Sequence, residues 1–478
     1  MGDFLQTLII AVTLGSLYAL IALGYTMVYG ILKLINFAHS DVVVLGAWVS
    51  FTIATFFLTR VGVDLNHAPW WAGGFVLVSA MVICGLIGFS IERLAYKPIR
   101  KAPRLNALIT AIGVSLFLQN VGQLHYTIVP SEKQIASGKV VDRGSNPKSI
   151  KLSEPITIAK ATTYQLKLQP ANGTPTQRKI VAEPGKYDAG AELAIDQPIG
   201  RAQTRDTTFT LFRVAPPLVL PFGAMPAGIP KLLPERKLWE HKFTTQIRVN
   251  AYQDPAAAVA SVAAAASQPV GAATSQPADV ATSQPIAAPV VEAVDVAPDG
   301  TKLVTISKPI AITLLDVTIL GTALALMLAL EVLIFHTRLG TAMRAVSYNF
   351  DTSGLMGIPV DRIISITFVT GAALAAAAGF LYAMRYQQIQ QPAHQTWVLL
   401  GLKAFVAAVV GGIGNVRGAA VGGFLIAFIE QFSGVYFGRW FHWDNAAAFT
   451  DVYVFALLII VLLVKPSGLF GSTVREKV

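Results

Sequence analysis

Long apolar stretches recur through this sequence and restrict it to folds that can bury them in protein or in lipid. They fall at about residues 5–30, 41–59, 70–91, 105–124, 311–335, 361–384, 398–413, 418–434 and 451–465. Several approach the roughly 20 apolar residues that a helix needs to cross a bilayer. Mean hydropathy is +0.56 and 13% of the 478 residues are charged, well below the share in soluble proteins. The sequence therefore predicts an all-α polytopic membrane protein with about eight or nine transmembrane helices.

Basic residues in short loops predict the orientation of these helices. The stretch "ERLAYKPIRKAPR" (92–104) holds five Lys or Arg, "HTRLGTAMR" (336–344) is also basic, and Lys465, Arg475 and Lys477 follow the last apolar stretch. Lys and Arg close to span ends favour the cytoplasmic side of a membrane. We therefore expect these regions and the C-terminus in the cytoplasm, and residues 125–310 on the extracytoplasmic side.

Residues 125–310 form a polar insertion between two transmembrane parts, residues 1–124 and 311–478. Residues 125–250 hold short runs of alternating polar and apolar residues separated by Pro and Gly, which is typical of short strands. The following stretch is dominated by Ala, Val, Pro, Ser and Gln and contains "ATSQP" twice. That composition provides too little bulky apolar surface to offset the entropy of ordering. We expect a β-rich unit over 125–250 and a flexible linker over 251–310.

The net charge of +10 does not point to nucleic acid as a partner. Residues 139–250 contain 17 Lys and Arg against 9 Asp and Glu, so the excess belongs mostly to the insertion, and no nucleic-acid-binding motif accompanies it. No GxxxxGK(S/T), HExxH or GxSxG pattern occurs, and Cys84 is the single cysteine. We therefore predict no catalytic residue, no metal site and no cofactor on this chain.

The stretch "INFAHSD" (35–41) places Asn36 and His39 between two apolar runs. Two interpretations stay open. One is a short hydrated turn. The other is a break in a membrane helix, where polar side chains and freed backbone groups line a path.

Charged residues within the apolar stretches need partners, because an unpaired charge in a bilayer costs several kcal/mol. Lys403 and Glu430 could pair with each other or face a central cavity, and Lys403 is a candidate pathway residue. For Glu430 we expect an interfacial position. Glu331 precedes a basic loop, and we expect an ion pair with Arg338.

Four segments resemble the permeases of branched-chain amino-acid ABC importers. They are "LGSLYALIALGYTMVYGILKLINFAHSDVVVLGAW" (14–48), "TRLGTAMRAVSYNFDTSGLMGIPVDRIISITFVTGAALAAAAGFLYA" (337–383), "GLKAFVAAVVGGIGNVRGAAVGGFLIAFIE" (401–430) and "FALLIIVLLVKPSGLFG" (455–471). The resemblance implies a type II-like inner-membrane permease for Leu, Ile and Val. It also implies a second homologous permease, two cytoplasmic ATPases that hold ATP and Mg, and a periplasmic amino-acid-binding protein as partners.

The sequence departs from that family at two places. The insertion 125–310 replaces a short loop, and "QPAHQTWVLL" (391–400) is more polar than the family pattern. A urea or short-amide permease of the same family is therefore an alternative. A membrane-anchored sensor or scaffold is an alternative of another class, although it would need neither Gly-rich membrane hairpins nor an ATPase-docking loop.

Residues 336–361 are the candidate coupling loop, which in such permeases docks on an ATPase. Of the basic regions, only this one is long enough to hold a separate helix between two spans. In "MRAVSYNFDTSGLMGIPVDR", a polar helical start precedes two glycines that would turn the chain and a Pro359 that would restart a helix. An ordinary cytoplasmic loop is the alternative. The candidate coupling residues are Arg344, Asn349, Asp351, Gly354, Gly357 and Asp361.

Overall fold

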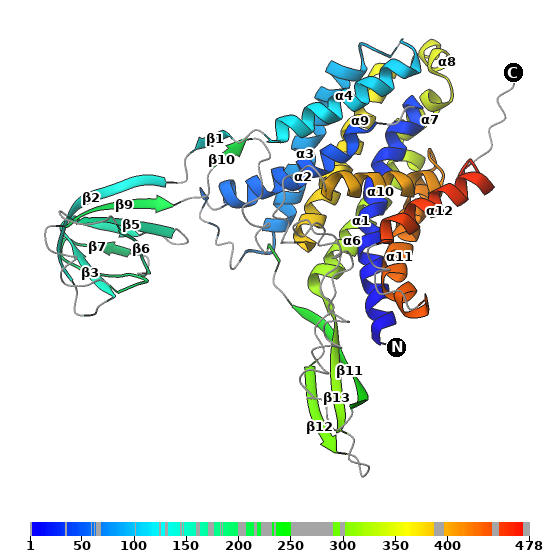
Figure 1. Cartoon of the computed structure of the whole chain (residues 1–478). Helices are drawn as coiled ribbons and strands as arrows, with labels where there is room; N and C mark the ends of the chain where they lie inside the picture. The colour runs from blue at the N-terminus through cyan, green and yellow to red at the C-terminus, as the bar shows by residue number, and fades with distance from the viewer. Residues whose placement is uncertain are drawn as a thin grey trace.

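The apolar stretches form a bundle of helices, and the insertion forms strands that project from it (Figure 1). The computed structural model describes residues 2–33, 36–58, 60–61, 63, 68–100, 102–123, 126–129, 132–143, 146, 148–158, 163–170, 176–181, 183, 185–198, 207–214, 218–220, 232–233, 236–249, 290–296, 302–386, 396–441 and 449–471. The helices are α1 (Gly2–Leu32), α2 (Ala38–Thr52), α3 (Ala72–Ile91), α4 (Arg104–Gln123), α6 (Leu314–His336), α7 (Arg338–Tyr348), α8 (Phe350–Leu355), α9 (Val360–Arg385), α10 (Thr396–Gly411), α11 (Val416–Phe441) and α12 (Thr450–Val464). Short π-helical segments extend α2 over Ile53–Leu58 and α3 over Glu92–Tyr96.

The polytopic helical fold predicted from the sequence is confirmed. Within the described residues, six helices are long and apolar enough to cross a membrane: Phe4–Leu32, Ala38–Leu58, Ala72–Tyr96, Leu314–His336, Val360–Arg385 and Val416–Phe437. Three shorter apolar helices accompany them, at Leu105–Val121, Leu399–Gly411 and Thr450–Val464. The predicted eight or nine spans therefore correspond to six full-length helices and three shorter ones.

Helix α1 lies at the centre of the bundle, where it packs against α9, α10 and α11. The apolar parts of α1, α2 and α9 are mostly buried, whereas those of α3 and α6 are mostly exposed. Small residues bring the central helices close together: a side chain on Gly379 would collide with the backbone of Val43, and one on Gly423 with that of Ala19. Such contacts favour helix association in membranes, because the hydrophobic effect contributes little between helices there.

A six-stranded antiparallel sheet occupies much of the first part of the insertion and lies beyond α4 in Figure 1. Its strand order is β6-β5-β9-β2-β3-β8, with β6 (Thr176–Lys179), β5 (Thr163–Pro170), β9 (Thr207–Val214), β2 (Glu132–Arg143), β3 (Ser149–Leu152) and β8 (Glu192–Ala194). Two smaller pairs accompany it, β1 (Tyr126–Val129) with β10 (Leu218–Leu220) and β4 (Ile156–Ile158) with β7 (Gly185–Tyr187). Alternate residues such as Ile150, Leu166 and Leu211 form an apolar core separate from that of the helices. Residues 125–250 are thus rich in strands, as predicted.

A second, three-stranded antiparallel sheet leads into α6. Its order is β11 (Lys237–Val249), β13 (Lys302–Thr313), β12 (Val290–Val296). The prediction of a flexible linker over 251–310 is wrong for β12 and for most of β13. "VVEAVDV" and "KLVTISKPIAIT" are rich in β-branched residues, which favour strands, and β13 pairs with β12 on one side and with β11 on the other. The Ala- and Pro-rich composition of their neighbours hid this pattern. Residues 251–289 lie outside the described residues.

Candidate functional site

The break between α1 and α2 holds the buried side chain of Asn36. Lys33 after α1 has a φ of 54°, and α2 begins at Ala38. The side chain of Asn36 accepts hydrogen bonds from the backbone N–H of Ala38 (3.2 Å) and from the hydroxyl of Tyr96 (2.7 Å). Asn36 is buried, whereas Lys33 is exposed, so the break has one exposed end and one buried end. Both the hydrated turn and a role of Asn36 in a substrate path stay predictions.

His39 lies in the first turn of α2, packed against α1. Its ring meets that of Tyr25 edge to face, with centroids 4.5 Å apart. A side chain at Gly24 would collide with the imidazole, so Gly24 makes the space that His39 fills. His39 is buried, and its Nε2 has no hydrogen-bond partner among the described residues. Buried polar atoms without a hydrogen-bond partner are uncommon in proteins, because leaving such an atom unsatisfied costs free energy.

Lys403 on α10 lies between two carboxylates. Its Nζ is 2.8 Å from Oε1 of Glu430 on α11 and 2.7 Å from Oδ1 of Asp451 at the start of α12. The hydroxyl of Tyr18 on α1 donates to Oε2 of Glu430 over 2.8 Å. Of the alternatives considered for Lys403 and Glu430, mutual pairing is the one observed. The interfacial position predicted for Glu430 is wrong, because this part of α11 packs against α1 and α10 and leaves the side chain 2% exposed.

A second buried ion pair joins Arg385, the last residue of α9, to Asp316 in the first turn of α6. Their charged atoms are 3.4 Å apart, and both side chains are buried. At the first pair, Lys403 alone faces two carboxylates, Glu430 and Asp451, which leaves a formal charge of −1.

The candidate coupling loop contains two helices, α7 and α8, joined at Asn349. The side-chain oxygen of Asn349 accepts hydrogen bonds from the backbone N–H groups of Asp351 and Thr352, both over 3.0 Å, and so caps α8. Gly357 has a φ of 82°, a backbone conformation that favours glycine, and Pro359 directly precedes α9. The chain thus turns at Gly357 as predicted. The same prediction for Gly354 is wrong, because this residue lies within α8.

The surface of α7 and α8 is exposed and partly apolar. Tyr348 is 93% exposed, Leu355 88% and Met356 78%. Between the helices runs a groove lined by Ala345, Tyr348, Asn349, Thr352, Ser353, Met356 and Ile358. Clustered exposed apolar side chains of this kind mark sites of protein interaction. Arg344 points back toward α6, with its guanidinium 5.5 Å from the ring of Phe335.

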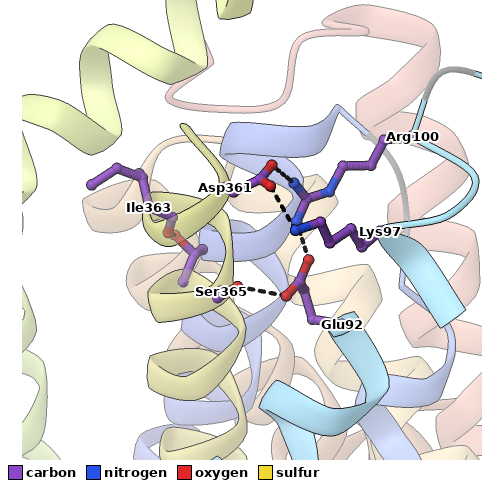
Figure 2. A network of polar contacts seen from close by, with 7 residues as sticks. Glu92, Lys97, Arg100, Asp361, Ile363 and Ser365 are labelled. Atoms are coloured by element: carbon purple, nitrogen blue, oxygen red, sulfur yellow. Dashed lines mark hydrogen bonds and ion pairs between the residues drawn. The ribbon is translucent and has the colours of Figure 1, made fainter. Parts of the chain in front are cut away.

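Asp361 connects the end of this loop to the basic segment that follows α3 (Figure 2). Its carboxylate is 2.7 Å from both Lys97 Nζ and Arg100 Nη1. Arg100 also pairs with Glu92, whose side chain is fully buried and accepts a 2.6 Å hydrogen bond from Ser365 on α9. Arg100 therefore bridges Asp361 in the first turn of α9 and Glu92 in the continuation of α3.

Comparisons with known proteins agree with this architecture. A sequence model of the family "Branched-chain amino acid transport system / permease component" matches residues 7–142 and 259–462. The chain belongs to this permease family. It is 30% identical to the high-affinity branched-chain amino acid transport system permease protein LivH of Escherichia coli (strain K12), over 99% of this chain and 98% of that protein. LivH of Salmonella typhimurium is 29% identical and BraD of Pseudomonas aeruginosa 27%, with the same coverage. No solved structure matches the chain.

Two basic regions of this permease are bound to neighbouring parts of the helical bundle. The segment 92–100 is bound to Asp361. The stretch after α12 folds back on the α10–α11 turn, where the N–H of Leu469 donates to the carbonyl of Val410 and the side chain of Asn415 donates to Phe470.

One predicted ion pair of the permease is replaced by another. Glu331 accepts hydrogen bonds from Arg417 at 3.0 Å and 2.6 Å, so the expected pair with Arg338 is wrong. The expectation placed Arg338 in a basic loop within reach of Glu331. Instead α6 ends at His336, and Arg338 begins a new helix after the N-cap Thr337.

Several residues in and around the buried ion pairs were missed by the sequence analysis of this permease. Tyr18 lies in an uninterrupted apolar run, where nothing marks it as a partner for a carboxylate. Asp316, Arg385 and Asp451 stand at the ends of apolar runs, where charges ordinarily meet water. Glu92 stands at the start of a stretch with five basic residues. A position at the end of an apolar run hid the burial of Glu92, Asp316 and Arg385.

Proposed function

We propose that this chain is the permease subunit of an ATP-binding-cassette importer that moves branched-chain amino acids inward across the inner membrane. The printed functions of LivH and BraD support the substrate class. In this proposal the chain assembles with a second homologous permease, two cytoplasmic ATPases and a periplasmic amino-acid-binding protein. Residues 125–310 and the binding protein are extracytoplasmic, and the C-terminus is cytoplasmic.

The exposed α7–α8 segment is the observation that carries the proposal. Because the sequence holds no nucleotide-binding motif, energy for transport must arrive through contact with another chain. The segment offers a groove and three exposed apolar side chains, Tyr348, Leu355 and Met356, for that contact. Asn349 and Gly357 fix its shape, and Asp361 links it to α3. Movement of the docked segment is thereby passed to the spans.

Asn36, His39 and Lys403 are proposed to line the path of the substrate. They come from the α1–α2 break and from α10. The sixteen residues of α10 rise about 24 Å, less than the roughly 30 Å of the hydrocarbon core. Interrupted or short helices with polar groups at their ends commonly line the substrate sites of transporters.

The test is reconstitution of the full complex in proteoliposomes with external binding protein and internal ATP. Radiolabelled leucine, isoleucine and valine should enter, whereas urea and acetamide should not, and uptake should stop when ATP is omitted. Uptake of urea in place of leucine, or leucine uptake that does not require ATP, would refute the proposal.

A further inference from the structure

We infer that the charged cluster of Tyr18, Lys403, Glu430 and Asp451 is a recognition site for the zwitterionic α-amino and carboxylate groups of the substrate. Asp451 receives the ammonium group and Lys403 the carboxylate, as the substrate replaces the ion pair between them. The inference rests on the proposed function and adds to it the chemistry by which the path selects an amino acid.

The two carboxylates that share Lys403 differ in their freedom to move. Glu430 is 2% exposed, and its second oxygen is held by the hydroxyl of Tyr18. Asp451 is 40% exposed and lies in the first turn of α12. Asp451 can therefore leave Lys403, while Glu430 stays as its partner. A buried cation that keeps one anion during the exchange avoids the large cost of an uncompensated charge.

The excess negative charge of the cluster attracts the ammonium group of an incoming zwitterion. With Lys403 against both Glu430 and Asp451, an ammonium group entering beside Asp451 meets an excess of negative charge. The substrate carboxylate then takes the position on Lys403 that Asp451 has left. An uncharged solute such as urea cannot supply either charge, and it would have to separate Lys403 from Asp451 without replacing the ion pair. The cluster thus favours amino acids over neutral amides.

The cluster lies deep in the bundle and close to the α1–α2 break. Tyr18 is near the middle of α1, the central helix. On α10, Gly401 packs directly against Ser40, and any side chain at Gly401 would collide with it. Ser40 follows His39 in the first turn of α2, so α10 joins the charged cluster to the polar break. Ionisable residues at such depth are characteristic of transport paths.

The experiment compares Asp451→Asn with the unaltered chain in the reconstituted complex. The readout is the number of leucine molecules taken up per ATP hydrolysed. We expect Asp451→Asn to lower this ratio about tenfold, the effect of losing one hydrogen bond to a charged group, while loaded binding protein still stimulates ATP hydrolysis. Asp451→Glu, which keeps the carboxylate, should restore most of the ratio. Because Asp451 is partly exposed, both variants should fold.

Glu331→Gln is the matched control, because it removes a carboxylate of similar exposure, 33%, from an ion pair with Arg417 on another part of the bundle. It should leave the ratio unchanged. An unchanged ratio in Asp451→Asn overturns the inference and leaves the proposed function intact. Loss of stimulated ATP hydrolysis together with uptake also overturns it, since that result marks a structural role. If the unaltered complex takes up no leucine, the proposed function itself fails.

Discussion

The carboxylate of Asp361 lies 2.7 Å from the guanidinium of Arg100, and this ion pair joins residues 261 positions apart in the chain. Arg100 is paired with Glu92 as well, so one guanidinium holds an exposed acid and a fully buried acid at once. The exposed acid ends the coupling segment, and the buried one belongs to the continuation of α3. Removing one or the other should therefore have different consequences.

Asp361→Asn should reduce uptake with little loss of stability, whereas Glu92→Gln should clearly lower the stability of the permease. The exposed pairs of Asp361 contribute about 1 kcal/mol or less. Loss of the buried Glu92 carboxylate removes a fully buried partner of Arg100 and the acceptor of the Ser365 hydroxyl, and losing such a hydrogen bond to a charged group costs about 1.5–3 kcal/mol. Thermal unfolding of the purified permease in detergent measures stability, and uptake in proteoliposomes measures coupling. Equal unfolding midpoints for the two variants would contradict this division.

Gly357→Val should abolish uptake, whereas Gly354→Ala should be tolerated. At a φ of 82°, Gly357 has a conformation that a β-branched residue adopts only with strain. Gly354 lies within α8, where an added methyl group meets no atom within 4 Å. Alanine is also more favourable than glycine in a helix by about 1 kcal/mol. Both variants should insert normally into the membrane, as measured by fractionation and immunoblotting. Wild-type uptake by Gly357→Val would place the docking site elsewhere.

The cap of α8 should control contact with the ATPase. Asn349→Ala removes an N-cap, which costs about 1 kcal/mol, while Asn349→Asp keeps an acceptor for the same N–H groups. A cysteine introduced at the exposed Leu355 should crosslink to the ATPase chain in the resting complex. We expect the crosslink to weaken in Asn349→Ala and persist in Asn349→Asp. A crosslink that is indifferent to both changes would show that α8 does not need its cap to dock.

Cysteine labelling tests the proposed orientation. Ser137→Cys on β2 and Tyr348→Cys on α7 both present exposed thiols, and the native Cys84 is buried. An impermeant maleimide added to spheroplasts should label position 137 directly and position 348 only after lysis. The opposite pattern would invert the topology.

The sequence was informative wherever a local pattern decides structure. Apolar runs predicted the helices, and Gly357 with Pro359 predicted the turn and restart before α9. Sequence was weak where the partner of a residue lies far along the chain. Tyr18 and Glu430 are 412 positions apart, and nothing near either residue indicates the other. Glu331 shows the same limit, since its pairing with Arg417 depends on how α6 and α11 pack.

The strand that runs directly into a membrane helix has a mechanical consequence. β13 ends at Thr313 and α6 begins at Leu314, so no linker separates them. Thr313 and Asp316 close a reciprocal capping box at this junction, so the first turn of α6 is formed directly at the end of the strand. Displacement of the three-stranded sheet would therefore act directly on the start of α6, where Asp316 pairs with Arg385.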